Sequence, residues 1–112
     1  MISGAHVMIF TRDEDADRVF LRDIVGIPCI DSGEGWLIYK LPPAEMGVHG
    51  GEQNDLHQLY FMCDDLDAEI ARLGEAGAAC SESFTASWGR ATAIPLPGGG
   101  KIGLYEPRHA RP

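Results

Sequence analysis

The first half of the chain reads as one strand, one helix and three further strands. Residues 5–11 (AHVMIFT) alternate between two faces, which predicts a strand. Residues 12–26 space their apolar side chains three to four positions apart, which predicts a helix. Short apolar runs bounded by turn residues then predict strands at 27–31, 35–41 and 44–50.

The second half repeats this order. A strand is predicted first, then a helix whose apolar stripe is Leu66, Ile70 and Leu73, then three strands. The predicted ranges are 57–63, 64–77, 78–83, 89–96 and 101–107. A polar linker, GGEQND (50–55), separates the halves. The sequence therefore predicts an α+β protein of two tandem βαβββ units, about 1–50 and about 55–107, within a single domain, 1–112.

Direct comparison of the halves supports a repeat. At an offset of 51 residues His6 falls on His57 and Cys29 on Cys80, and at an offset of 56 Gly47 falls on Gly103. The nearest rival is a ferredoxin-like β-α-β-β-α-β sandwich, which has only two strands between its helices. About four are predicted here between Gly26 and Asp64.

Helix ends can be assigned from residue type. Asp13 or Thr11 can cap the first helix, and the acidic residues after them suit the positive end of the helix dipole. Gly26 fits the position just past the end of that helix.

Charge and cysteine content narrow the possible functions. The net charge of −8 argues against binding nucleic acid. Three cysteines without metal-type spacing predict buried, reduced thiols in a cytoplasmic protein. The sequence MISGAHVMIF has no basic region before an apolar stretch, so we expect no signal peptide, and no run is long enough to cross a membrane.

The ordered pieces HQLYFMCDDLDAEIARLGEAGA, WGR (88–90) and PGGGKIGLYEP resemble the vicinal oxygen chelate superfamily, the group of glyoxalases, bleomycin-resistance proteins and extradiol dioxygenases. This resemblance implies that the two units form an open, barrel-like mixed sheet with helices on the outside, and that a second subunit often completes the cleft. It also implies a divalent metal, Fe, Mn, Zn or Ni, held by the first and last strands of each unit. His6 and His57 match two of these ligand positions.

The other two ligand positions depart from the family pattern. The last strand usually carries a glutamate, but this chain has Gly103 there, and the repeat makes Gly47 its counterpart. Strand alternation puts Glu45 and His49 on the face of Gly47, so Glu45 is a substitute third ligand or a base. Tyr105 shares the face of Gly103 and is a candidate proton donor.

Four further residues are candidates for contact with a ligand. They are Trp36, His49, Trp88 and Arg90. Each has a simpler interpretation: the tryptophans fit a core or rim, and strand histidines are often only lining residues.

Two functions remain open from the sequence. The first is a metal-dependent lyase, isomerase or ring-cleavage dioxygenase acting on a substrate with vicinal oxygens. The second is a metal-free protein that sequesters a small ligand, as in the bleomycin-resistance branch, with a cationic or aromatic ligand favoured by the charge and the tryptophans. Both predict a homodimer, because a two-unit chain leaves a sheet edge and half a cleft open.

Overall fold

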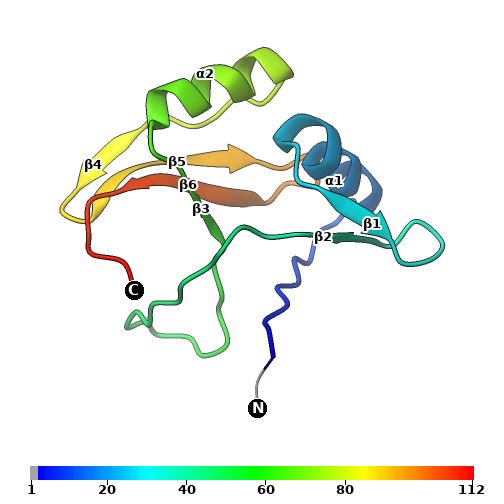
Figure 1. Ribbon diagram of the computed structural model, residues 1–112, viewed down its shortest axis with the longest axis horizontal. Helices are drawn as coiled ribbons and strands as arrows, with labels where there is room; N and C mark the ends of the chain where they lie inside the picture. Colours follow the sequence, from blue (N-terminus) through cyan, green and yellow to red (C-terminus); the bar gives the residue numbers. More distant parts are fainter. Residues whose placement is uncertain (1–2) are drawn as a thin grey trace.

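The protein is described here as a computed structural model covering residues 3–112 (Figure 1). In chain order the elements are α1 (Glu14–Phe20), the π-helical segment η1 (Leu21–Val25), β1 (Cys29–Asp31), β2 (Leu37–Tyr39), β3 (Tyr60–Met62), α2 (Leu66–Ala76), β4 (Phe84–Ala86), β5 (Gly89–Pro95) and β6 (Lys101–Pro107). They form an antiparallel β1–β2 pair and a four-stranded sheet ordered β3-β6-β5-β4. The predicted α+β class is therefore confirmed.

The second half of the chain contains a β-α-β-β-β order, from β3 through α2 to β6. The first strand lies parallel to the last, with Tyr60 opposite Gly103, and the other pairs are antiparallel. The strand predicted at 78–83 lies instead at Phe84–Ala86. Ala86 pairs with Gly89 across a tight turn, whereas Ser81 makes only one backbone bond, from its N–H to the Ala93 carbonyl at 2.9 Å.

The helix α2 covers one face of this sheet. The Asp65 side chain caps it by accepting the Ala68 N–H at 3.1 Å, and Gly77 ends it in the left-handed conformation with φ 109°. Its apolar stripe packs onto the inward-facing residues of β5 and β6. The buried residues of this core are Leu66, Leu73, Ala78, Ile94 and Leu104.

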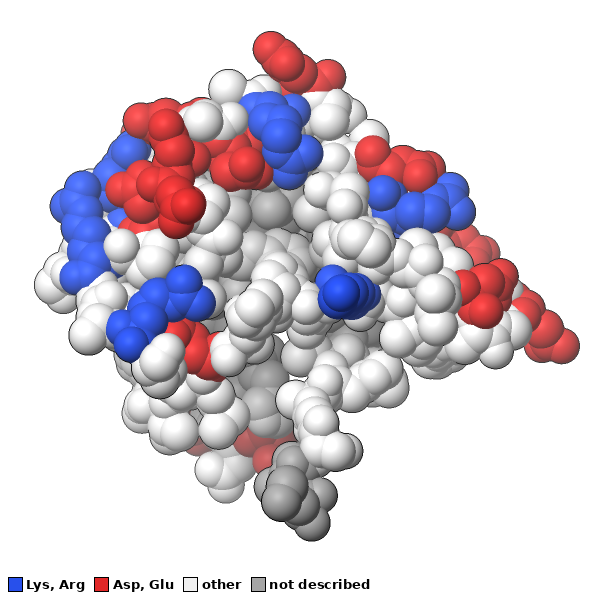
Figure 2. Space-filling view, in the orientation of Figure 1, with Lys and Arg blue, Asp and Glu red and all other residues white. Residues whose placement is uncertain are grey.

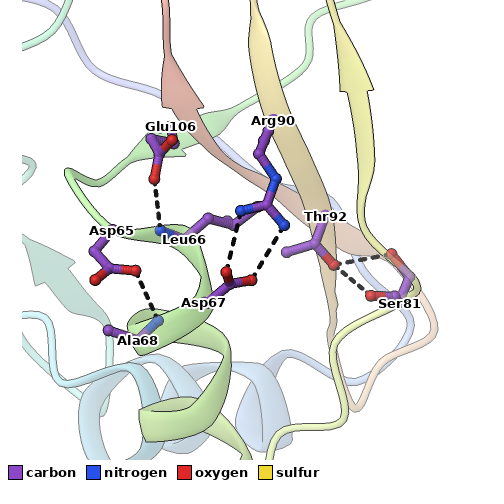
Figure 3. A network of polar contacts seen from close by, with 8 residues as sticks. All are labelled: Asp65, Leu66, Asp67, Ala68, Ser81, Arg90, Thr92 and Glu106. Atoms are coloured by element: carbon purple, nitrogen blue, oxygen red, sulfur yellow. Dashed lines mark hydrogen bonds and ion pairs between the residues drawn. The ribbon is translucent and has the colours of Figure 1, made fainter.

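Polar contacts fix the start of α2 to the same face of the sheet (Figure 3). Glu106 on β6 accepts the Leu66 N–H at 3.1 Å, and Arg90 on β5 makes two bonds to Asp67, at 3.1 and 3.2 Å. Glu106 thus lies opposite the face of Gly103, as strand alternation predicts.

The first helix joins the two halves. Asp13 caps α1 by accepting the Ala16 N–H at 3.1 Å, and Gly26 closes η1 in the left-handed conformation, so both predicted helix ends are confirmed. The buried Asp17 accepts the Gly98 N–H at 2.7 Å, which ties α1 to the β5–β6 turn. A second buried cluster lies alongside and consists of Leu21, Leu96 and Ile102.

The first half differs from its prediction. Residues 5–11 and 44–50 form no strand in the described chain, and their apolar side chains stay exposed, with Phe10 at 89% and Val48 at 96%. The physical reason is that no strand in residues 3–112 pairs with either segment. The βαβββ unit predicted at about 1–50, and with it the tandem arrangement, is therefore not confirmed, and residues 3–112 form no closed barrel.

Charged side chains lie mainly around the rim of the face in Figure 2, with uncharged residues across most of its middle. None of the helices in residues 3–112 has the length and apolar character needed to span a membrane.

We expect the α2 cap to carry measurable stability. Replacing Asp65 by alanine should lower the free energy of unfolding by about 1 kcal/mol, because the Ala68 N–H loses its acceptor. The matched control is Asp64→Ala, which removes a neighbouring exposed carboxylate and should change stability by less than about 0.5 kcal/mol. Urea denaturation of both variants checks this, and equal losses would contradict the capping role.

Candidate functional site

The sheet face opposite α2 carries aromatic side chains above a floor of small residues. Strand pairing assigns this face. Tyr60 of β3 lies opposite Gly103 of β6, Ala93 of β5 lies opposite Gly103 from the other side, and Phe84 of β4 lies opposite Ala91. Small side chains on β5 let larger rings from both flanks lean over the sheet.

Four rings form a continuous row across this face, which we call the aromatic row: Phe84, Trp88, Tyr105 and Tyr60. Successive centroids are 6.0, 5.4 and 5.8 Å apart, and each pair is edge-to-face, at 84°, 81° and 85°. Phe84, Trp88 and Tyr60 remain substantially exposed. A protein seldom leaves several adjacent rings in water, so the row is the main candidate for ligand contact.

Gly103 allows the ring of Tyr60 to form one end of the aromatic row. A Cβ at this position would overlap the ring of Tyr60, so only glycine lets that ring lie against the sheet. The glycine thus makes room for an aromatic side chain at the position where the superfamily's last strand carries its carboxylate ligand.

A polar cluster borders the row at Tyr105. The Tyr105 hydroxyl lies 3.0 Å from Nε2 of His109, whose ring stacks on the Tyr105 ring at 5.9 Å and 29°. His109 Nδ1 donates a hydrogen bond to the Ala110 carbonyl at 2.9 Å. In the neutral ring Nε2 therefore carries no hydrogen and accepts a hydrogen bond from the Tyr105 hydroxyl. Glu45 Oε2 binds Arg111 Nε at 3.3 Å, and Glu45 Oε1 lies 3.9 Å from His109 Nε2.

Burial raises the pKa of Tyr105, and the nearby Glu45 carboxylate raises it further, against the opposing effect of Arg111. Tyr105 is therefore a protonated hydroxyl at neutral pH. The structure brings together Glu45 and Tyr105, the two residues predicted to be catalytic. It adds His109 and Arg111, which sequence reasoning missed.

The residues predicted as metal ligands are not gathered into a site. His6 and His57 are both exposed, and residues 3–112 contain no group of three or more histidine, cysteine or acidic side chains placed to hold a metal. The space beside Gly103 is filled by Tyr60. The donor set of this chain does not fit the metal that the superfamily commonly binds.

The other predicted contact residues are scattered. Trp36 lies on the β1–β2 hairpin with the Arg18 guanidinium 5.0 Å from its ring, at the opposite end of the molecule from the β4–β5 turn (Figure 1). His49 is exposed and its Nδ1 donates to the adjacent Gly50 carbonyl at 2.6 Å. Arg90 lies on the α2 side, paired with Asp67 (Figure 3). Of the four, Trp88 alone belongs to the aromatic row.

Cys63 and Cys80 show no sign of reactivity. Burial raises the pKa of the Cys63 thiol to about 11 and also raises the pKa of Cys80. The Cys63 thiol donates weakly to the Tyr105 carbonyl at 3.7 Å. Thiols with raised pKa are poor nucleophiles at neutral pH, which favours the predicted structural role.

Two open hollows of the surface lie elsewhere. One, of about 630 Å³, lies between residues 10–12 and the glycines 98–100, and another, of about 530 Å³, lies between η1 and α2. Neither is lined by a residue of the aromatic row. The row is an open surface, which is what half of a cleft would present.

The fold was compared with known proteins. No family model matches the chain, and no curated protein matches it. Among solved structures it is similar to TnmS3, an antibiotic binding protein from Streptomyces sp. CB03234, with 27% identity and a TM-score of 0.67 over 96% of this chain and 99% of that one. A glyoxylase/bleomycin resistance protein/dioxygenase domain from Frankia sp. EAN1pec gives 20% and 0.66 over 96% and 100%. A lactoylglutathione lyase from Agrobacterium tumefaciens gives 17% and 0.62 over 92% and 94%.

These likenesses confirm the resemblance read from the sequence. The chain has the fold of the vicinal oxygen chelate superfamily, which includes glyoxalases, bleomycin-resistance proteins and dioxygenases.

The contact between Gly103 and Tyr60 can be tested by a double-mutant cycle. We expect Gly103→Ala to lower the free energy of unfolding by about 1–3 kcal/mol, because the added methyl group overlaps the Tyr60 ring. In a Tyr60→Ala background the same change should cost much less. Thermal and urea unfolding of the four proteins measures the coupling, and equal costs in both backgrounds would show that the ring does not occupy this space.

Proposed function

We propose that this protein binds a flat aromatic small molecule on the aromatic row and sequesters it without metal chemistry. The observation that carries the proposal is the exposed edge-to-face series of four rings over small strand residues. Exposed ring edges and faces offer a flat ligand both stacking and edge-to-face contacts, and neither depends on a reacting group.

Two further observations favour sequestration over the metal-dependent alternative. The superfamily's carboxylate position is glycine covered by Tyr60, so a chelating site would lack its usual acidic ligand. The structural relative at 27% identity, TnmS3, is described as an antibiotic binding protein. We extend the binding of a small molecule, and not the particular antibiotic, to this chain. The three unbridged cysteines support a cytoplasmic location for it.

The site is proposed to be completed by a second copy of the chain. The aromatic row is open, and residues 5–11 and 44–50 expose apolar side chains without a strand partner. A two-fold partner would cover both at once, because each subunit offers the same open face and the same unpaired segments. The metal-dependent lyase or dioxygenase that the family resemblance implies would need His6 and His57 as ligands, and residues 3–112 do not bring them together with a third donor.

Trp88 should contribute to ligand affinity. With 9-aminoacridine as a flat fluorescent probe, Trp88→Ala should weaken binding about tenfold, or ~1.4 kcal/mol, through loss of a stacking surface. Trp36→Ala is the matched control, since Trp36 is similarly exposed but lies beside Arg18 on the β1–β2 hairpin. Titration should give the same affinity with and without a chelator. Equal effects of both tryptophan changes would argue against the aromatic row.

We expect a homodimer of twice the 12.1 kDa chain mass. Light scattering coupled to size exclusion at micromolar concentration measures this directly. Val48→Glu, which puts a charge on a side chain that is 96% exposed in one chain, should shift the dimer toward monomer if segment 44–50 lies at the interface. A monomeric wild-type protein at this concentration would contradict the expectation.

A further inference from the structure

The polar cluster beside Tyr105 contains an unusual carboxylate. The side chain of Glu45 is 18% exposed, and its two oxygens have different surroundings. Oε2 is held by Arg111 at 3.3 Å, whereas Oε1 is buried and has no hydrogen-bond partner in the described chain. A buried carboxylate oxygen without a donor is costly, so this position calls for an N–H or O–H group.

A group close to that oxygen is the imidazole of His109. Its Nε2 lies 3.9 Å from Oε1 of Glu45, which is too far for a hydrogen bond, and 3.0 Å from the Tyr105 hydroxyl. In the neutral ring Nε2 accepts a hydrogen bond from the Tyr105 hydroxyl, so it has no hydrogen to donate to Glu45. The imidazole therefore fills the space between Tyr105 and Glu45 without satisfying the carboxylate.

His109 also resembles a ligand in its placement. Its ring is the one that stacks on the aromatic row, at 29° to Tyr105, whereas the pairs within the row are all edge-to-face. The residue lies after β6 in segment 108–112, which runs on the side of the sheet away from α2 (Figure 1). His109 is exposed. Within the described chain its ring makes hydrogen bonds only with the carbonyl of the next residue, Ala110, and with the Tyr105 hydroxyl. Few contacts would be lost if the ring moved out.

We propose that His109 is an internal stand-in for the ligand, and that the ligand replaces it with a flat ring bearing an N–H donor. The ring stacks on Tyr105 and the N–H donates to Oε1 of Glu45, while Arg111 keeps the carboxylate in place. This inference rests on the proposed binding function and adds to it the chemical class of the ligand and a self-occupied state that competes with it.

Two flat cationic probes that differ in their N–H donors separate the two parts of the proposal. 9-Aminoacridine and 10-methylacridinium share the same ring system and the same positive charge at neutral pH, but only 9-aminoacridine carries N–H donors. The protein variants are wild type, His109→Ala, Glu45→Gln, the His109→Ala/Glu45→Gln pair and Arg108→Ala. Arg108→Ala is the matched control, because Arg108 is an exposed residue of the same segment whose side chain makes no hydrogen bond or ion pair among residues 3–112.

Removing the stand-in should strengthen binding. We expect His109→Ala to bind 9-aminoacridine about tenfold more tightly than wild type, since the competent state no longer has to expel the imidazole. Arg108→Ala should bind as wild type does. Adding Glu45→Gln to His109→Ala should weaken 9-aminoacridine at least tenfold more than 10-methylacridinium, because both cations lose the attraction of the carboxylate but only the amino group donates to Oε1.

The proposal is overturned if His109→Ala binds 9-aminoacridine no more tightly than Arg108→Ala, or if the Glu45→Gln change affects both probes equally. These results are distinct from failure of the binding function, which would show as equal affinities in wild type and Trp88→Ala. A second readout covers a poorly folded His109→Ala: in wild-type protein, saturating 9-aminoacridine should shift the NMR signal of the His109 ring. An unchanged signal in a saturated protein would also overturn the proposal.

Discussion

The contact between Tyr60 and Gly103 determines which side chains line the open face of the sheet. β3 and β6 are parallel neighbours, so residue 60 must lie beside residue 103, and one of them has to be small for the other's ring to lie flat against the sheet. With glycine on β6, the space goes to an aromatic ring and the row runs on to Tyr105. With a carboxylate there, the same strand pairing would place a metal ligand. The two arrangements exclude each other.

The opposite face of the same strands has a separate role. Alternate residues of β5 and β6 face either α2 or the aromatic row. Arg90 and Glu106 hold the helix (Figure 3). Ala91 and Tyr105 lie on the other face and shape the candidate site. Period-two alternation makes this division strict. Ligand contact can therefore vary on one face while the helix packing on the other face stays intact.

Sequence patterns predicted the helices and strands whose packing and hydrogen-bonding partners lie within the described chain. α2, the cap of α1 at Asp13, the helix end at Gly26, β5 and β6 all follow from local periodicity and turn chemistry. The site was harder to predict. Alternation and the repeat pointed to Glu45 and Tyr105 as candidates, whereas His109 and Arg111 lie outside any periodic segment. Their positions depend on how segment 108–112 folds back onto Tyr105, for which a single sequence holds no local signal.

The missing strands and the open site have the same cause. A strand is stable only when its backbone groups find partners, and an aromatic face is stable in water only when something covers it. Within residues 3–112, segments 5–11 and 44–50 have no strand partner, and the aromatic row is not fully covered. The apolar stripe of α2, in contrast, is packed into the core. His109 covers part of the row, but as one exposed ring it leaves Trp88 and Phe84 in contact with water. The second half of the chain is thus well packed and fixes the geometry of the candidate site, whereas the first half contains apolar segments that have no strand partner within residues 3–112.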